Sequence, residues 1–355
     1  METKDRPVYV DTLWVRHCNS CSNVDNAATD PEEKYLIPPV CTPQGMRQSL
    51  RLALGISSFA RSMGVPVPSG VRFYCSYLPR AMLTACLAAS ALHALWGEGK
   101  RIKVQALCHV GELPNPFERE AQGALGADKR GCVRVSSESI STEGDSGCWR
   151  RKINQMMRDA GFAARVRAPM QDCAPRTGDC SPGWKKAWMF GDGDFDWVLQ
   201  NLVPGWLEKG DQELQVVVSH GTYIKELAAH NSPQLVQVDV QNTGVIVQRY
   251  EGVSTAEGAQ QRVRFLRATT PDTQGAGKRL PETTSSPEAE ALLETLSSQA
   301  DAQFGPDPCD WKGDGSFREC LKGPKEATLA ALHARAQSAH SRGLDQSLIP
   351  SSTSP

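Results

Sequence analysis

Three apolar stretches of the chain stop abruptly at cationic or imidazole side chains. Each stretch alternates or is rich in β-branched and aromatic residues, which predicts a β-strand, and a helical pattern follows each of them. The stretches are residues 8–15, 71–76 and 214–219. The side chains that follow them are Arg16, His17, Arg80 and His220. Because parallel strands end at one edge of a sheet, we expect these four side chains to meet there. Two guanidiniums and two imidazoles beside helix N-termini predict a pocket for a phosphoryl group.

The spacing of apolar residues predicts the remaining elements. Helices are expected at residues 44–63, 77–95, 149–160, 191–207 and 222–230. Thr42 with Pro43 is predicted to begin the first helix, and Ser76 to cap the second. Further strands are expected at residues 101–107 and 263–268, with a hairpin that pairs residues 235–240 with 244–250 around residues 241–243. Together they predict an α/β fold with a mostly parallel sheet.

The composition excludes several classes of protein. The 355 residues carry a formal net charge of −1, so there is no bulk attraction to nucleic acid or to an anionic membrane. No apolar stretch reaches the roughly 18–20 residues of a membrane span. The 12 cysteines are scattered, and the charged N-terminus lacks the apolar core of a signal peptide. We therefore expect a soluble, intracellular, cytoplasmic protein with reduced thiols and with no nucleic-acid or membrane partner.

Four ordered motifs carry a family resemblance. They are Arg16-His17-x-x-Ser20-x-x-Asn23, Thr42-Pro43-x-Gly45-x-x-Gln48, Ser76-x-x-x-Arg80-x-x-x-Thr84 and Ser219-His220-Gly221. In order and spacing they resemble the motifs of the histidine phosphatase superfamily, also called phosphoglycerate-mutase-like. The resemblance implies a three-layer α/β/α sandwich over residues 6–270, with a long insertion at about 114–193. Residues 271–355 are expected to form a partly disordered C-terminal tail with short helices at 288–302 and 326–341.

The resemblance also implies an activity and roles for individual residues. The chain would be a metal-independent phosphomonoester hydrolase without a cofactor, and His17 would become a phosphohistidine that water then hydrolyses. The catalytic set is His17, Glu112 and His220, and the phosphate-binding set is Arg16, Arg80, Asn23, Ser76 and Gly221. Glu112, which follows the strand at 101–107, matches the proton donor, with Glu118 as fallback. That role requires a raised pKa at the carboxyl, whereas His220 would be cationic beside the phosphate.

Several alternatives stay open at the level of sequence. Cys18-Asn19 stands where the family usually has Gly-Glu, so we expect Cys18 to narrow the pocket and Asn19 to tolerate left-handed geometry. The missing Glu favours a phosphatase over a mutase. A catalytically weak relative that binds phosphorylated ligands remains an alternative, and the phosphorylated partner is either a small molecule or a phosphoprotein.

Cys18-x-x-Cys21 lacks the second ligand pair of a structural zinc site. The helix at 149–160 has a basic face, either solvated or forming a lid over the substrate. That face consists of Arg150, Arg151, Lys152 and Arg158.

Overall fold

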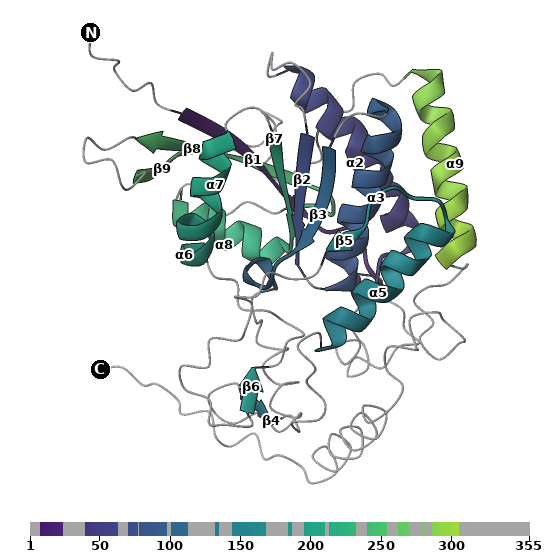
Figure 1. The fold of residues 1–355 in the computed structure, drawn as a ribbon, viewed down its shortest axis with the longest axis horizontal. Helices are drawn as coiled ribbons and strands as arrows, with labels where there is room; N and C mark the ends of the chain where they lie inside the picture. Colours follow the sequence, from purple (N-terminus) through teal and green to yellow (C-terminus); the bar gives the residue numbers. More distant parts are fainter. Residues whose placement is uncertain are drawn as a thin grey trace, which may run out of the picture.

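A mixed seven-stranded sheet forms the centre of the computed structural model (Figure 1). The structure describes residues 8–23, 40–62, 70–76, 78–97, 101–112, 132–134, 144–167, 184–186, 195–209, 213–231, 240–253, 262–269, 280 and 286–304. The strands are β1 (Val8–Arg16), β2 (Gly70–Cys75), β3 (Arg101–Ala106), β5 (Val166–Arg167), β7 (Glu213–Ser219), β8 (Val245–Val253) and β9 (Arg262–Thr269). Their order is β5-β3-β2-β7-β1-β8-β9, parallel from β5 to β1 and antiparallel beyond.

Helices cover both faces of this sheet (Figure 1). On one face lie α2 (Pro43–Ser62), α3 (Pro79–Trp96), α5 (Gly144–Asp159) and α9 (Pro287–Phe304). The other face carries α6 (Phe195–Trp197), a π-helical turn η4 (Val198–Leu202), α7 (Val203–Lys209) and α8 (Gly221–Asn231). Two short 3-10 turns, η1 (Cys21–Asn23) and η2 (Cys108–Val110), follow β1 and β3. A separate antiparallel pair joins β4 (Cys132–Arg134) to β6 (Trp184–Lys186). The expected three-layer α/β/α sandwich with a mostly parallel sheet is confirmed.

The alternation of side chains along β1 explains why both faces need helices. Leu13 and Val15 point into the core shared with α2 and α3, whereas Trp14 points into the core under α7 and α8. All three are fully buried. Burying a large apolar side chain contributes roughly 1.5–3 kcal/mol, so a strand that is apolar on both faces is stable only between two layers.

Most of the predicted elements are present, and two details differ. Ser76 does not cap α3. The N-cap residue of this helix is Leu78, and Ser76 Oγ only accepts a hydrogen bond from the Leu78 N–H at 3.3 Å. The predicted hairpin is contradicted along β8, which pairs with β1 on one side and β9 on the other, while residues 235–239 lie outside the described residues. Both edges of β8 are therefore already occupied.

The C-terminal part of the chain and the predicted insertion both contribute to the central sandwich. The helix expected at 288–302 is present as α9, which packs on α2 and α3 through Leu293, Leu296 and Ala300. Within the segment expected to be an insertion, β5 joins the main sheet beside β3, and α5 packs on α3. The helix expected at 326–341 lies outside the described residues.

Candidate active site

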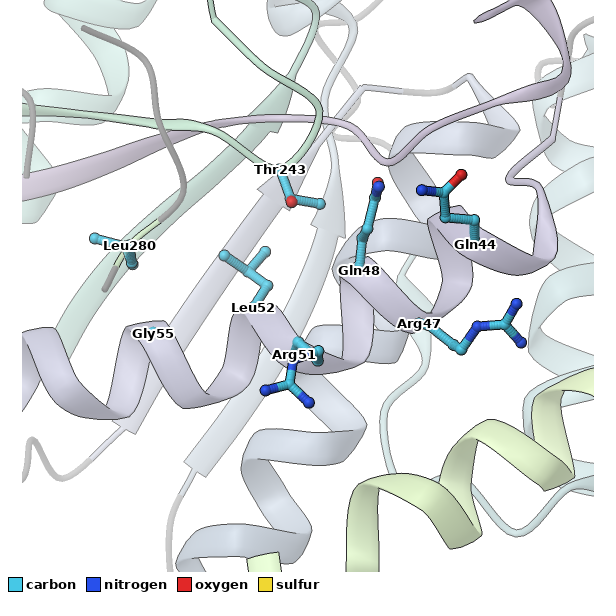
Figure 2. A pocket seen from close by; sticks show the side chains of 8 residues that line it. All are labelled: Gln44, Arg47, Gln48, Arg51, Leu52, Gly55, Thr243 and Leu280. Carbon is cyan, nitrogen blue, oxygen red and sulfur yellow. The ribbon is translucent and has the colours of Figure 1, made fainter. Parts of the chain in front are cut away.

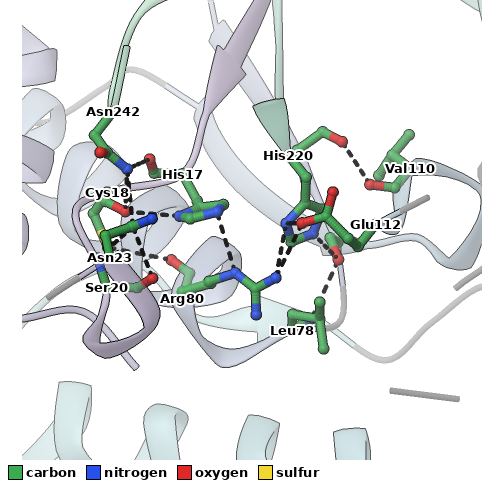
Figure 3. Close-up of polar contacts among 12 residues, drawn as sticks. His17, Cys18, Ser20, Asn23, Leu78, Arg80, Val110, Glu112, His220 and Asn242 are labelled. Carbon is green, nitrogen blue, oxygen red and sulfur yellow. Dashed lines mark hydrogen bonds and ion pairs between the residues drawn. The ribbon is translucent and has the colours of Figure 1, made fainter. Parts of the chain in front are cut away.

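Three of the predicted side chains, His17, Arg80 and His220, meet with Glu112 at the carboxyl edge of the sheet (Figure 3). Strands β3, β2, β7 and β1 are consecutive neighbours, so the residues after them share one end of the sandwich. Glu112, Arg80, His220 and His17 follow these strands in that spatial order. Residues that lie up to 140 positions apart in the sequence are thus brought within hydrogen-bond distance of one another.

Arg80 lies at the centre of this cluster, in the first turn of α3. Its Nε donates to His17 Nε2 at 3.1 Å, and its Nη2 lies 3.2 Å from both Glu112 Oε2 and His220 Nδ1. The residue is 6% exposed, so the guanidinium is held almost entirely by these partners and by the fold. A planar guanidinium fixed on a rigid helix is suited to binding two oxygens of a phosphoryl group at once.

His17 is a neutral imidazole whose Nε2 faces the guanidinium of Arg80. Its Nδ1 lies 2.7 Å from the Cys18 carbonyl, which can only accept, so Nδ1 carries the proton and Nε2 carries the lone pair. Burial, followed by the charges of Arg80, His220 and Arg16, lowers the pKa of His17 well below its usual range. The side chain therefore has the protonation state that a nitrogen nucleophile needs.

His220 is also neutral in this structure, contrary to the expected cation. Burial lowers its pKa below the usual value despite the opposing influence of Glu112. Nδ1 lies 2.9 Å from Glu112 Oε2 and must donate to it, because an ionised carboxylate only accepts. Nε2 then accepts from Ser76 Oγ at 2.9 Å. Ser76, expected to bind phosphate, therefore orients the imidazole that lies beside the phosphate pocket.

Glu112 is ionised, whereas its expected role as proton donor called for a raised pKa. Burial alone would raise the pKa of this carboxyl, but His220 and Arg80 outweigh burial and lower it to about 2. The turn that carries Glu112 is fixed from two sides. Ser219 Oγ donates to the Val110 carbonyl at 2.7 Å. The ring of His109 in η2 stacks on the ring of Trp197. Glu118, the fallback donor, lies outside the described residues.

Arg16 contributes a second guanidinium beside the cluster. Nη1 donates to the Val240 carbonyl at 2.7 Å, while the buried Nε has no hydrogen-bond partner among the described residues. Gly221 makes room for this side chain, because a Cβ there would lie 3.1 Å from Arg16 Nε. Gly221 thus allows Arg16 to lie against the N-terminus of α8, where a positive partial charge also favours an anion.

The motif at the start of α2 holds the loop that follows His17. Thr42 N–H donates to the Asn19 carbonyl at 3.0 Å, its Oγ1 donates to Asn19 Oδ1 at 2.8 Å, and Gln48 Oε1 accepts from Asn19 N–H at 3.1 Å. Thr42 Oγ1 also accepts from Gly45 N–H at 3.0 Å, which confirms its capping role. A Cβ on Gly45 would lie only 1.9 Å from the Asn19 carbonyl oxygen. Thr42 and Gln48 therefore hold Asn19 in place, and Gly45 leaves room for its carbonyl.

Cys18 and Cys41 form a disulfide, so the expectation of reduced thiols is wrong for these residues. Cys21 is disulfide-bonded as well, whereas Cys75 and Cys86 are free and buried. The argument from cysteines for an intracellular protein is thereby removed, because such bonds persist mainly in oxidising compartments.

The Cys18 side chain is buried in the fold together with Cys41. Its sulfur is buried with that of Cys41 beside the Arg80 backbone carbonyl, 3.8 Å from that oxygen. Cys18 N–H donates to Thr84 Oγ1 at 2.9 Å. Neither Cys18 nor Asn19 has a positive φ, so the glycine that the family usually has is not required by the backbone here.

Sequence reasoning missed the loop before β8, which contacts the backbone of His17 and Cys18. Asn242 Nδ2 donates to the carbonyls of Cys18 at 2.9 Å and His17 at 3.2 Å, and to Asn23 Oδ1 at 3.3 Å. Thr243, with φ of 57°, donates its N–H to the Arg16 carbonyl at 3.0 Å. Asn23, expected to bind phosphate, is exposed and accepts from Ser20 N–H at 3.0 Å. The sequence of this loop contains no distinctive motif, so it gave no signal of its contacts with the segment around His17.

His17, Glu112 and His220 form the one group among the described residues whose ligand atoms lie close enough to hold a metal ion. Arg80, however, lies within 3.2 Å of an atom of each of them. A divalent cation at that point would meet a fixed guanidinium and would have to displace it. The donor set does not fit a resident metal.

A second cavity, of about 220 Å³, lies along α2 away from this cluster (Figure 2). Gln48 and Thr243 line it, and both also contact the loop that follows β1. Arg47 and Arg51 at its rim form ion pairs with Asp301 and Glu290 of α9. The cavity contains none of the predicted catalytic side chains.

The basic face of α5 is divided by the packing of that helix. Arg150 is buried, whereas Arg151 and Arg158 are exposed and Lys152 is half-buried. The opposite face packs into the core through Ile153, Met156 and Met157. α5 is thus anchored on α3.

Comparison with known proteins adds a resemblance at the level of solved structures. No protein-family model and no curated protein matches the chain. A phosphoglycerate mutase from Bacillus anthracis is 13% identical, with a TM-score of 0.38, and the match covers 82% of this chain and 97% of that one.

Two phosphatases give comparable matches. An alpha-ribazole phosphatase from Shigella flexneri is 13% identical, with a TM-score of 0.30, over 72% of this chain and 95% of its own. A phosphoserine phosphatase from Entamoeba histolytica is 13% identical, with a TM-score of 0.28, over 73% and 96%. At identities this low, the chemistry that the site can support follows from its own side chains. In the part that the structure describes, no helix is both long and apolar enough to cross a bilayer.

Proposed function

We propose that the chain is a metal-independent phosphomonoester hydrolase that acts through a phosphohistidine at His17. The observation that carries the proposal is the neutral imidazole of His17, whose Nε2 lone pair faces a buried guanidinium at 3.1 Å. A buried nucleophile beside a fixed cation has little use in a structural core. It is the arrangement that phosphoryl transfer requires.

In the first step the phosphoryl group binds between Arg80, Arg16 and His220. Arg80 turns its N–H groups from Glu112 and His17 to the phosphoryl oxygens, and the unpartnered Nε of Arg16 supplies a further donor. His17 Nε2 then attacks phosphorus, the P–N bond forms, and the bond to the leaving oxygen breaks. The Nδ1–H bond to the Cys18 carbonyl keeps the ring aligned and stabilises the positive charge that develops on it.

Glu112 supplies and recovers the proton. Its carboxylate is ionised while Arg80 and His220 both contact it. A bound phosphate dianion competes with Glu112 for the N–H groups of Arg80 and adds negative charge nearby, and both changes raise the pKa of Glu112 until it takes up a proton. The acid protonates the leaving alkoxide. The carboxylate then accepts a proton from water, which attacks the phosphohistidine and breaks the P–N bond.

Trapping the intermediate tests this proposal. Rapid acid-free quenching of turnover with a ³²P-labelled phosphomonoester should leave an acid-labile, base-stable label on the peptide that contains His17. His17→Asn should lose the label and the turnover. His93→Gln, a matched change at a half-buried histidine near the end of α3, should keep both. Label on another residue, or turnover without any label, would contradict the proposal.

One observation favours a second function, the binding of phosphorylated ligands without turnover. The pKa of about 2 leaves Glu112 without a proton to give in the resting site. Under this alternative, inorganic phosphate and phosphomonoesters bind in the pocket, yet no label forms with any substrate. Calorimetry with inorganic phosphate, run beside the trapping experiment, separates the two functions.

A further inference from the structure

The residue next to the nucleophile is tied to the fold in three ways. The Cys18 carbonyl accepts from His17 Nδ1 at 2.7 Å and from Asn242 Nδ2 at 2.9 Å, and the Cys18 N–H donates to Thr84 at 2.9 Å. Its sulfur is bonded to Cys41. Both the position of this carbonyl and the direction of the His17 lone pair therefore depend on where Cys18 is held.

The disulfide joins the backbone segments that build the phosphate pocket. Cys41 immediately precedes Thr42 and Pro43, where α2 begins, and it forms an isolated antiparallel bridge with Ser20. The Cys41 sulfur lies 3.4 Å from the Arg80 carbonyl in the first turn of α3. The bond thus lies between the loop after β1, the start of α2 and the start of α3, which carry the nucleophile, its support and the central guanidinium.

The burial of this bond makes its loss costly for the geometry of the site. Both cysteines are fully buried. When the bond breaks, the two sulfurs must withdraw to a non-bonded contact of about 3.5–4 Å. The packed surroundings leave no room for the side chains alone to take up that movement, so the Cys18 backbone moves as well. A misplacement of about 1 Å in a reacting group can lower a rate about 10²-fold.

We propose that the Cys18–Cys41 disulfide is a positioning device for His17 and that its reduction switches the site to a low-turnover state. The inference rests on the hydrolase function proposed above. In the switching step a dithiol reductant attacks the S–S bond, which breaks as two electrons and two protons pass to the cysteine sulfurs and the reductant becomes a disulfide. Reduction acts mainly on kcat, because Arg80 and Arg16 stay in place to bind phosphate.

A single variant isolates this bond from the other disulfides. A reductant also acts on Cys21, so Cys41→Ser should be compared with the wild-type chain before and after dithiothreitol, with complete reduction verified by thiol alkylation. We expect wild-type kcat to fall about 10- to 100-fold on reduction. Oxidised Cys41→Ser should already have the low kcat and change little further. Cys86→Ala, which removes a buried free thiol from α3, should behave as the wild type does.

A second readout distinguishes positioning from general destabilisation. The Kd for inorganic phosphate should change less than threefold in Cys41→Ser, while the ¹⁵N signal of His17 should shift from the Nδ1–H tautomer towards a mixture. If Cys41→Ser fails to fold, the same two readouts on the reduced wild-type chain decide the question. Unchanged kcat and unchanged His17 signals after verified reduction would overturn the inference. Absence of turnover and label in the oxidised wild-type chain would instead overturn the proposed hydrolase.

Discussion

Replacing Gly45 with alanine should damage the site from a distance. The new Cβ lies 1.9 Å from the Asn19 carbonyl oxygen and must withdraw by about 1.5 Å to reach an ordinary contact. The obstacle is backbone on both sides, since Gly45 is in α2 and Asn19 is held by Thr42 and Gln48. Overpacking of this kind costs about 1–3 kcal/mol, and losing the 3.0 Å bond from Thr42 N–H adds about 1 kcal/mol.

The loop shift should be visible in catalysis as well as in stability. Asn19 is two residues from His17, so a shift of about 1 Å there should lower kcat on the order of 10²-fold. Urea unfolding and steady-state turnover of an aryl phosphate measure the two effects. Gly205→Ala is the matched control, because a Cβ at that position in α7 meets nothing within 4 Å. It should be neutral or more stable by about 0.5–1 kcal/mol. A Gly45→Ala protein as stable and as active as the control would refute this reasoning.

Three further predictions concern the charges of the site. Glu112→Gln should slow alkyl phosphates far more than aryl phosphates, which need little protonation of the leaving group; equal losses on both in steady-state assays would exclude the donor role. Prolonged EDTA treatment should leave turnover unchanged, because Arg80 occupies the space between the groups that could hold a metal; loss of rate restored by a divalent ion would contradict this. The free energy of unfolding should fall as pH drops below about 6.5, because the unfolded chain protonates its histidines there while the lowered pKa keeps His17 neutral. Urea titrations at pH 7.5 and 5.5 should show a smaller fall in His17→Asn, and an equal fall would argue against the lowered pKa.

The sequence predicted the meeting of distant residues well because strand ends carry directional information. An apolar run that stops at Arg16-His17, and another that stops at Ser219-His220, place those side chains at one edge once the strands are parallel. Position along a strand is a local property, and the parallel arrangement follows from the helices between strands. The position of these side chains at strand ends and the parallel arrangement of the strands were enough to predict that they meet.

Protonation states and long-range partners were harder to predict, since both depend on contacts made in three dimensions. Glu112 was expected to have a raised pKa from burial, yet two cationic or donating neighbours reverse the sign. The partner of Cys18 could not be read from spacing, because Cys41 is 23 residues away in the sequence. The pairing of β8 was mispredicted for a similar reason: short-range turn signals favoured a local hairpin, while β1 offered a long apolar edge.

The position of β1 in the sheet has a consequence for how the protein is made. Among the described strands it is the first to be synthesised, yet its parallel neighbour is β7, and Thr12 pairs with Gln215. Its other neighbour, β8, comes later still. Until β7 and β8 have been synthesised, both edges of the apolar strand β1 are unpaired. Unpaired apolar strands favour aggregation. Contacts of such high sequence separation also slow folding, so nascent chains of this protein should depend on holding chaperones until the last third of the sequence has emerged.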